Sequence, residues 1–276
     1  MGRGPHSSGR RHNLLGRIVM DFVTTALFAL LGAVAVGAVT FAIGYRMKRY
    51  DVVDAAWGWM FIVPAWVAAL LHDMEPHAVM IAFIVTVWGL RLSYHIVGRI
   101  RTTTHEDERY VALRSKWPKR YTVLQIFVRI YLLQAVLAVI IATPVIGIIA
   151  STAVDGVLLA AGVAVSVLGI VIELIADRQL KSFIGKPENS GKLMQTGLWR
   201  YSRHPNYFGE TLMWWGMGIA AIGSSIGLFG LVGPAVITLL LLFISGVPPA
   251  ERRAQSKPGW NEYKRKTPVL VPFIRL

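Results

Sequence analysis

The residues best suited to chemistry gather between positions 200 and 210, in the stretch Arg-Tyr-Ser-Arg-His-Pro-Asn-Tyr-Phe-Gly-Glu. Proline favours the first position of a helix, so Pro205 predicts a helix start. That helix would direct free N–H groups and the positive end of its dipole at the residues just before it. Together with Arg200, Arg203 and His204, it forms a corner that can bind an anion. The alternative is a cytoplasmic loop whose charges only fix topology, but the asparagine and the aromatic residues favour a ligand site.

Two acidic pairs lie at the edges of apolar runs, where ionisable side chains are candidates for function. Asp51 and Asp54 are three residues apart, so they share one face of a predicted helix. They could equally be acidic caps of that helix. Glu173 and Asp177 are four residues apart near the end of another run. Two carboxylates there oppose the helix dipole, which argues for a cation or a hydrogen-bonding ligand nearby.

A third set of polar residues lies at the end of an apolar run and in the long loop that follows it. Arg91, His95 and Arg99 repeat every four residues and form one polar stripe. The loop then carries one histidine and three acids at positions 105–108. This spacing matches no common metal site, so we expect a solvated loop or a polar lid and no metal.

The composition indicates a polytopic, all-α transmembrane helix bundle. The chain has 276 residues, 54% of them hydrophobic, a formal net charge of +14 and no cysteine. Runs of about 20 nearly uncharged residues have the length that crosses a bilayer. Without cysteine there is no disulfide, thiolate nucleophile or cysteine-based metal site. We predict about seven spans, at roughly 18–44, 53–71, 77–97, 123–149, 155–176, 207–222 and 226–246.

The distribution of Lys and Arg predicts the orientation of these spans. Seven lie in 98–122, six in 177–205 and seven after residue 246, whereas 72–76 and 223–225 hold none. The positive-inside rule makes the basic side cytoplasmic, so the basic excess does not require nucleic acid. The four Arg of the N-terminus disagree, unless the first segment lies on the membrane surface. We expect a flexible basic segment at 1–17, followed by a single transmembrane domain at 18–276.

The tail at 247–276 alternates turn formers, charges and aromatic residues and closes on an apolar run. A disordered tail would need neither Trp260 nor Tyr263, so we expect it to fold back beneath the bundle.

The stretch at 200–210 resembles the signature of the steroid 5-alpha-reductase-like integral membrane proteins. Its core, Arg-His-Pro-x-Tyr-x-Gly, is shared with the sterol reductases and the isoprenylcysteine carboxyl methyltransferases. Segments 51–58, 91–110, 176–216 and 251–274 also resemble a bacterial branch of this family, largely of undefined substrate. The resemblance implies a reductase in the bacterial inner membrane that uses NADPH to reduce a double bond in a lipid-soluble substrate. The active site would open to the cytoplasm, and the steroid-like, isoprenoid or acyl substrate would enter from the bilayer.

The resemblance also implies the site residues by motif position. Tyr94, His95 and Glu106 are the nearest candidates for polarising the substrate. Leu180 and Ile184 depart from the family pattern, because they occupy positions that are often cationic; Lys181 and Lys186 can substitute from neighbouring positions. The residues that would line the cofactor are Asp177, Lys181, Lys192, Trp199, Arg203, His204, Asn206, Tyr207, Glu210, Arg252 (or Arg253) and Tyr263.

Two other functions fit parts of the same pattern. A methyltransferase that uses S-adenosylmethionine shares the core motif, but its tail resembles a paired Glu-Glu. Here Glu251 stands alone between Ala250 and Arg252, which favours the reductase. A non-enzymatic membrane protein is the third alternative, and it is disfavoured because a polar pocket at membrane depth costs stability without a ligand.

Overall fold

The computed structural model describes residues 6–103, 105–115, 117 and 122–274, and side chains from residue 16 onward. Over these residues the chain consists of helices and connecting turns without a strand, which confirms the predicted all-α class. It divides into two compact units, Met1–Val154 with Ser224–Gly227, and Asp155–Gly223 with Leu228–Leu276. Each unit is described by itself. The single transmembrane domain expected from the sequence stays a prediction.

The first unit is built on three long helices joined by short connections. Helix α1 (His6–Met47) packs along α3 (Trp59–Leu71), and α3 packs against α4 (Pro76–Arg101). The short helix α2 (Val52–Ala56) lies between α1 and α4, and α5 (Glu108–Ser115) follows the loop after α4. Helix α1 already begins at His6, and the first five residues lie outside the described ones. The flexible basic segment expected at 1–17 stays a prediction.

The run predicted as one span at 123–149 is divided, and the stretch that is long and apolar enough to cross a membrane, Thr122–Ile141, ends before the predicted boundary. It comprises α6 (Thr122–Ile126), a π-helical stretch η1 (Phe127–Leu132), α7 (Leu133–Ile141) and α8 (Thr143–Ile149). Pro144 lacks the N–H that would continue α7, so the helix ends and restarts around Ala142. All seven residues of α8 are buried, so this apolar segment is core of the first unit.

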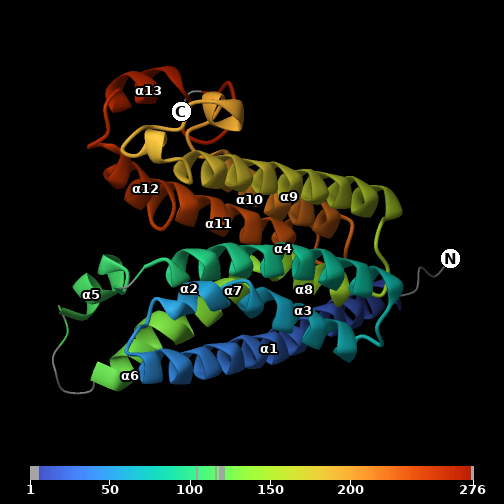
Figure 1. Cartoon of the computed structure of the whole chain (residues 1–276). Coiled ribbons are helices and arrows are strands. Elements are labelled where there is room, and N and C mark those ends of the chain that lie inside the picture. Colours follow the sequence, from blue (N-terminus) through green and yellow to red (C-terminus); the bar gives the residue numbers. More distant parts are fainter. Residues whose placement is uncertain (1–5, 104, 116, 118–121, 275–276) are drawn as a thin grey trace. The chain divides into compact units, whose positions relative to one another are not determined.

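The second unit is centred on an antiparallel pair, α9 (Gly156–Ile184) and α10 (Pro205–Ile222), which lie side by side in Figure 1. Asp155 caps α9, since its carboxylate accepts from the N–H groups of Val157 and Leu158. The N–H of Asp155 in turn donates to the carbonyl of Gly223 over 2.8 Å, so the start of α9 meets the end of α10. The other ends of both helices therefore lie together, next to the connection 185–204.

Small residues allow these two helices to approach closely. A Cβ added at Gly209 would lie 2.6 Å from the backbone nitrogen of Glu173, and one at Gly169 would lie 2.4 Å from that of Met213. Farther along, Ser166 donates its hydroxyl to the carbonyl of Met213 over 2.9 Å. This contact fixes the register, so that polar residues near the end of α9 meet those at the start of α10.

The remaining helices of the second unit return the chain to the same end. After η4 (Gly227–Leu231), α11 (Val232–Phe243) packs against α10, and α12 (Val247–Ala254) follows it. Helix α13 (Trp260–Lys266) completes the tail. Two short 3-10 helices, η2 (Pro187–Asn189) and η3 (Gly197–Arg200), lie in the connection between α9 and α10.

Among the described residues, six helical stretches are long and apolar enough to cross a membrane. The seventh predicted span, 207–222, coincides with α10, which is not one of the six because its first turns are polar. Helix α9 continues eight residues beyond the predicted end at 176, through a segment rich in charge. The six stretches are Gly16–Met47, Val52–Leu71, Pro76–Arg101, Thr122–Ile141, Gly156–Ile184 and Gly227–Ala254.

Candidate functional site

Pro205 begins α10, as the sequence predicts, and the residues before it are held by the tail. The N–H of Arg203 donates to the carbonyl of Pro268 over 2.8 Å. The N–H of His204 donates to the hydroxyl of Ser202 over 3.1 Å. The approach to α10 is thus fixed by one backbone contact with a residue 65 positions later and by one local hydrogen bond.

The guanidinium of Arg203 holds the same tail. Its Nε donates to Glu251 Oε1 over 2.8 Å, and its Nη1 donates to the carbonyls of Lys264 and Thr267. The side chain is only 9% exposed. The structure therefore gives Arg203 internal partners, where the sequence suggested a contact with an anionic cofactor.

Glu251 is the carboxylate shared by this end of the second unit. Besides Arg203, its oxygens lie 3.5 Å from His204 Nε2 and 3.7 Å from Lys264 Nζ. The ring of His204 also stacks on that of Tyr207, with centroids 5.3 Å apart. Sequence reasoning gave Glu251 no role in a reductase. The available signal was that it is the only acid between residues 247 and 261.

Trp199 and Tyr263, both predicted to line a cofactor, are joined to each other. The hydroxyl of Tyr263 donates to the carbonyl of Trp199 over 2.6 Å, and Trp199 Nε1 donates to the carbonyl of Ala176 over 3.1 Å. Burial raises the pKa of Tyr263, so its hydroxyl stays protonated and available as a donor. This pair connects α13 and η3 to α9, and the tail folds back as the sequence predicts.

A buried polar row follows the seam between α9 and α10. Glu173, Asp177 and Glu210 are 3%, 8% and 6% exposed. Asn206 Nδ2 donates to Asp177 Oδ1 over 3.2 Å, so one carboxylate of α9 has a hydrogen-bond partner within the protein; the cation or ligand expected there stays a prediction. The Oδ1 atom of Asn206 is buried and has no hydrogen-bond partner among the described residues. A buried acceptor without a donor costs about 1–3 kcal/mol, so this atom marks a place where a ligand can bind.

The other predicted cofactor residues lie at the exposed margin of the second unit. Lys181 is exposed in the last turn of α9, Arg252 is exposed on α12, and Lys192 is exposed in the connection between α9 and α10. Leu180 and Ile184, which depart from the family pattern, line a cavity together with Lys186 and Lys192.

In the first unit, Asp51 and Asp54 bind the loop after α4. Arg49 donates to both oxygens of Asp51, over 3.0 and 2.8 Å, and the N–H of Asp107 donates to the same carboxylate over 3.1 Å. Asp54 accepts from the hydroxyl of Tyr110 and from Arg109 Nη2, the latter over 2.9 Å. Asp51 occupies the N-cap position of α2 without a side-chain capping bond, so the capping alternative is wrong for it.

The three predicted catalytic residues occupy different environments in this unit. Glu106 pairs with Arg114 through two hydrogen bonds and accepts from the N–H of Tyr50 over 2.7 Å. The hydrogen bond with Glu106 raises the pKa of Arg114. Tyr94 is 77% exposed, and His95 is also exposed on α4. The structure thus places Glu106 in a buried ion pair and Tyr94 at a surface.

The loop expected to be solvated or lid-like is held down by these ion pairs. Burial raises the pKa of the Tyr110 hydroxyl well above its usual value, so it remains a donor to Asp54. Within the described ranges, no cluster of three or more His, Cys, Asp or Glu could hold a metal ion.

The long apolar helices and the polar row between α9 and α10 define a polytopic integral membrane protein. Residues 40–267 match a family described as a protein of unknown function (DUF1295), and the chain belongs to that family. It is also similar to 3-oxo-5-alpha-steroid 4-dehydrogenase 1 of mouse, with 30% identity over 118 residues that cover 41% of each chain. The human protein of the same name is 27% identical over 119 residues, which cover 41% of this chain and 40% of the relative.

The chain thus spans about two fifths of the length of these curated relatives. Together, these matches confirm the resemblance to the steroid 5-alpha-reductase-like family that the sequence motifs indicate. No solved structure matches the chain.

Proposed function

We propose that the protein is a membrane-embedded reductase that uses NADPH to reduce a carbon–carbon double bond in a lipid-soluble substrate. The substrate would be steroid-like, isoprenoid or acyl and would enter from the bilayer. The observation that carries this proposal is the unsatisfied oxygen of Asn206 beside Asp177, in a buried row at the start of α10. The names of the relatives support it, since they refer to the dehydrogenation of 3-oxo-5-alpha-steroids.

The residues of the polar row fit the nicotinamide riboside half of the cofactor. Its ribose hydroxyls and its carboxamide are hydrogen-bond donors, and Asn206, Asp177 and Glu210 offer buried acceptors. The phosphates need cations instead. Lys181, four residues after Asp177, and Arg252, next to Glu251, are exposed and are the candidates. When bound, NADPH would supply the hydride; the chain supplies orientation and a polar, partly desolvated environment.

The contacts of Trp199, Arg203, His204 and Tyr263 assign them a positioning role in this proposal. They join the tail to the residues that precede α10. Tyr207 extends the same group through its stacking on His204. Such residues hold Asn206 and Glu210 in place without touching the cofactor.

We propose the hydroxyl of Tyr94 as the hydrogen-bond donor to a substrate carbonyl, with His95 next to it on α4. Proton donation of this kind contributes about 10²- to 10⁴-fold to a rate. Glu106 is engaged by Arg114 and would act by holding the loop.

A thermal-shift comparison of the purified protein with NADPH, NADH and S-adenosylmethionine tests the cofactor. We expect NADPH to raise the melting temperature most. Asn206→Ala and Glu210→Ala should weaken NADPH binding by roughly 10-fold or more, since a hydrogen bond to a charged or buried group contributes about 1.5–3 kcal/mol. Asn261→Ala changes an exposed asparagine of α13 and serves as the control. Full NADPH affinity in both Asn206→Ala and Glu210→Ala would contradict the placement of the site.

One observation also favours a methyltransferase as the second candidate. The polar row carries three carboxylates, and S-adenosylmethionine brings a positively charged sulfonium and an amine. Stabilisation by S-adenosylmethionine but by neither dinucleotide would establish this alternative and overturn the reductase.

A further inference from the structure

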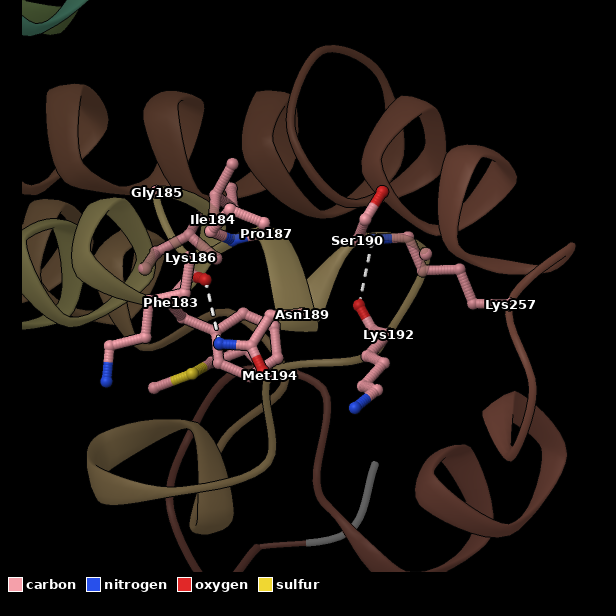
Figure 2. A pocket seen from close by; sticks show the side chains of 12 residues that line it. Phe183, Ile184, Gly185, Lys186, Pro187, Asn189, Ser190, Lys192, Met194 and Lys257 are labelled. Carbon is pink, nitrogen blue, oxygen red and sulfur yellow. Dashed lines mark hydrogen bonds between the residues drawn. The ribbon is translucent and has the colours of Figure 1, made fainter.

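A cavity of about 440 Å³ in the second unit lies at the C-terminal end of α9. Figure 2 shows it from close by, with the side chains that line it. One part of its lining is apolar: Leu180, Phe183 and Ile184 come from the last turns of α9, and Met194 comes from the connection that follows. Ile184 is 67% exposed, so apolar surface continues outward from the cavity.

The other part of the lining is cationic. Lys186 and Lys192 come from the connection after α9, and Lys257 comes from the segment between α12 and α13. None of the twelve described residues that line the cavity is acidic. The end of α9 contributes a partial negative charge, which three ammonium groups outweigh. The cavity therefore attracts an anion.

Two hydrogen bonds hold these segments around the cavity, and both are drawn in Figure 2. Lys257 Nζ donates to the carbonyl of Lys192 over 3.2 Å, which ties the tail to the connection. Asn189 Nδ2 donates to the carbonyl of Phe183 over 2.9 Å, which folds the connection back onto α9. The lysines thus come from segments more than 60 residues apart and are brought together by the fold.

The length of α9 fits a cavity at the level of lipid headgroups. A helix of 29 residues is about 43 Å long, whereas the hydrocarbon core of a bilayer is about 30 Å thick and the whole bilayer about 40–45 Å. If α9 spans the membrane, its charged last turns must leave the hydrocarbon and lie among the phosphates. Exposed Leu168, Val171 and Ile175 on the same helix provide a surface for acyl chains.

We propose that this cavity binds the phosphate-bearing headgroup of an anionic membrane lipid. The lysines would contact the phosphate, and Phe183 and Ile184 would contact the glycerol and the first methylenes of the acyl chains. A membrane lipid fits both halves of the lining, whereas a free phosphate ion would use only the cationic half. This proposal gives Lys192, which the family resemblance assigns to the cofactor, a lipid phosphate instead, and it uses none of the residues of the buried polar row.

Native mass spectrometry of the detergent-solubilised protein with phosphatidylglycerol or phosphatidylcholine of the same chain length tests the proposal. We expect phosphatidylglycerol to bind at least 10-fold more tightly. Each lysine near an anionic phosphate contributes about fivefold, so Lys186→Gln/Lys192→Gln should lower phosphatidylglycerol affinity on the order of 25-fold. Both residues are exposed, so the variant should keep its melting temperature.

The matched control is Lys48→Gln/Lys266→Gln, which removes two exposed lysines outside the cavity and should keep the affinity. Lys257→Arg keeps the charge of the third lysine and should bind as the unmodified chain does. Equal binding of the two lipids, or full phosphatidylglycerol affinity in Lys186→Gln/Lys192→Gln, would overturn the proposal. Displacement of the lipid by equimolar inorganic phosphate or by NADPH would also overturn it, since the cavity would then serve a free phosphate or the cofactor.

Discussion

At the scale of single residues, the second unit depends on one carboxylate in a basic tail. Glu251 lies between Arg203, His204 and Lys264, and its side chain is only 12% exposed. Removing one partner of a buried ion pair leaves the other charge desolvated and without compensation. Arg203 would then keep only its bonds to the tail carbonyls.

We therefore expect Glu251→Gln to destabilise the docking of the tail by up to about 3 kcal/mol, the lower end of the range for a broken buried pair. The change keeps the shape of the side chain and removes only its charge. Thermal denaturation and limited proteolysis after residue 246 would measure the effect. Glu262→Gln breaks the exposed pair with Lys266 and is the control, which should behave as the unmodified protein does. Equal stability of both variants would show that the Arg203–Glu251 pair does not hold the tail.

At the scale of elements, the pairing of α9 with α10 decides where the candidate site lies. Gly169 and Gly209 remove the side chains that would separate the helices, and Ser166 bonds across the seam. Farther along the pair, Asp177 accepts a hydrogen bond from Asn206. Since the polar row is made by both helices, any change in their separation changes the site.

We expect Gly209→Ala to lower the stability by about 1–3 kcal/mol, as overpacking does in other close-packed interiors. The added Cβ would lie 2.6 Å from the nitrogen of Glu173 and 2.7 Å from the oxygen of Gly169, and both atoms belong to backbone that cannot rotate away. The variant should also bind cofactor more weakly, because Asn206 would move from Asp177. Gly156→Ala, at the start of α9, meets nothing within 4 Å and should not destabilise. A melting temperature for Gly209→Ala at or above that of the control would contradict the close packing.

At the scale of the whole molecule, connections between helices are hydrogen-bonded to one another at one end of each unit. In the first unit, Arg49 reaches Thr103, so the connections 48–51 and 102–107 lie at one end. In the second unit, the connection before α10 and the tail lie together, because Arg203 bonds Glu251 and the carbonyl of Pro268. The connection 185–204 and the tail carry 11 of the 25 Lys and Arg after residue 45, and 48–51 carries two more, so the charge asymmetry agrees with the fold of each unit.

We expect these basic connections and the C-terminus to face the cytoplasm, and the connection before α4 to face outward. The chain has no cysteine, so single cysteines at Glu108, Glu188 and Asn261 can be labelled without background. An impermeant thiol reagent applied to intact cells should leave these three unlabelled. The same reagent should label Glu75→Cys, which is the positive control on the opposite side. Labelling of all three test positions from outside would reverse the orientation.

Local pattern was sufficient for much of the fold. The length of each apolar run and the spacing of charges depend only on residues that are close in the sequence. They were therefore enough to predict the all-α class and six of the membrane-spanning stretches. Pro205 predicted the start of α10 for the same reason. The break at Ala142 was missed because apolar length alone does not register a proline inside the run. The motif at 200–210 indicated the family, because a motif of consecutive residues can be recognised without knowing the fold.

Tertiary structure decided what the charged residues do. Arg203 and Glu251 are 48 positions apart, and Asp54 and Tyr110 are 56 apart, so no local spacing could reveal these pairs. The same residues that looked free to bind a cofactor or cap a helix are used to hold a tail and a loop. Only the pairing of α9 with α10 showed that Asp177 meets Asn206 while one oxygen of that amide remains unsatisfied. The sequence determined which residues are polar at membrane depth, and the fold decided which of them are left for a ligand, because hydrogen-bond partners are chosen by proximity in space.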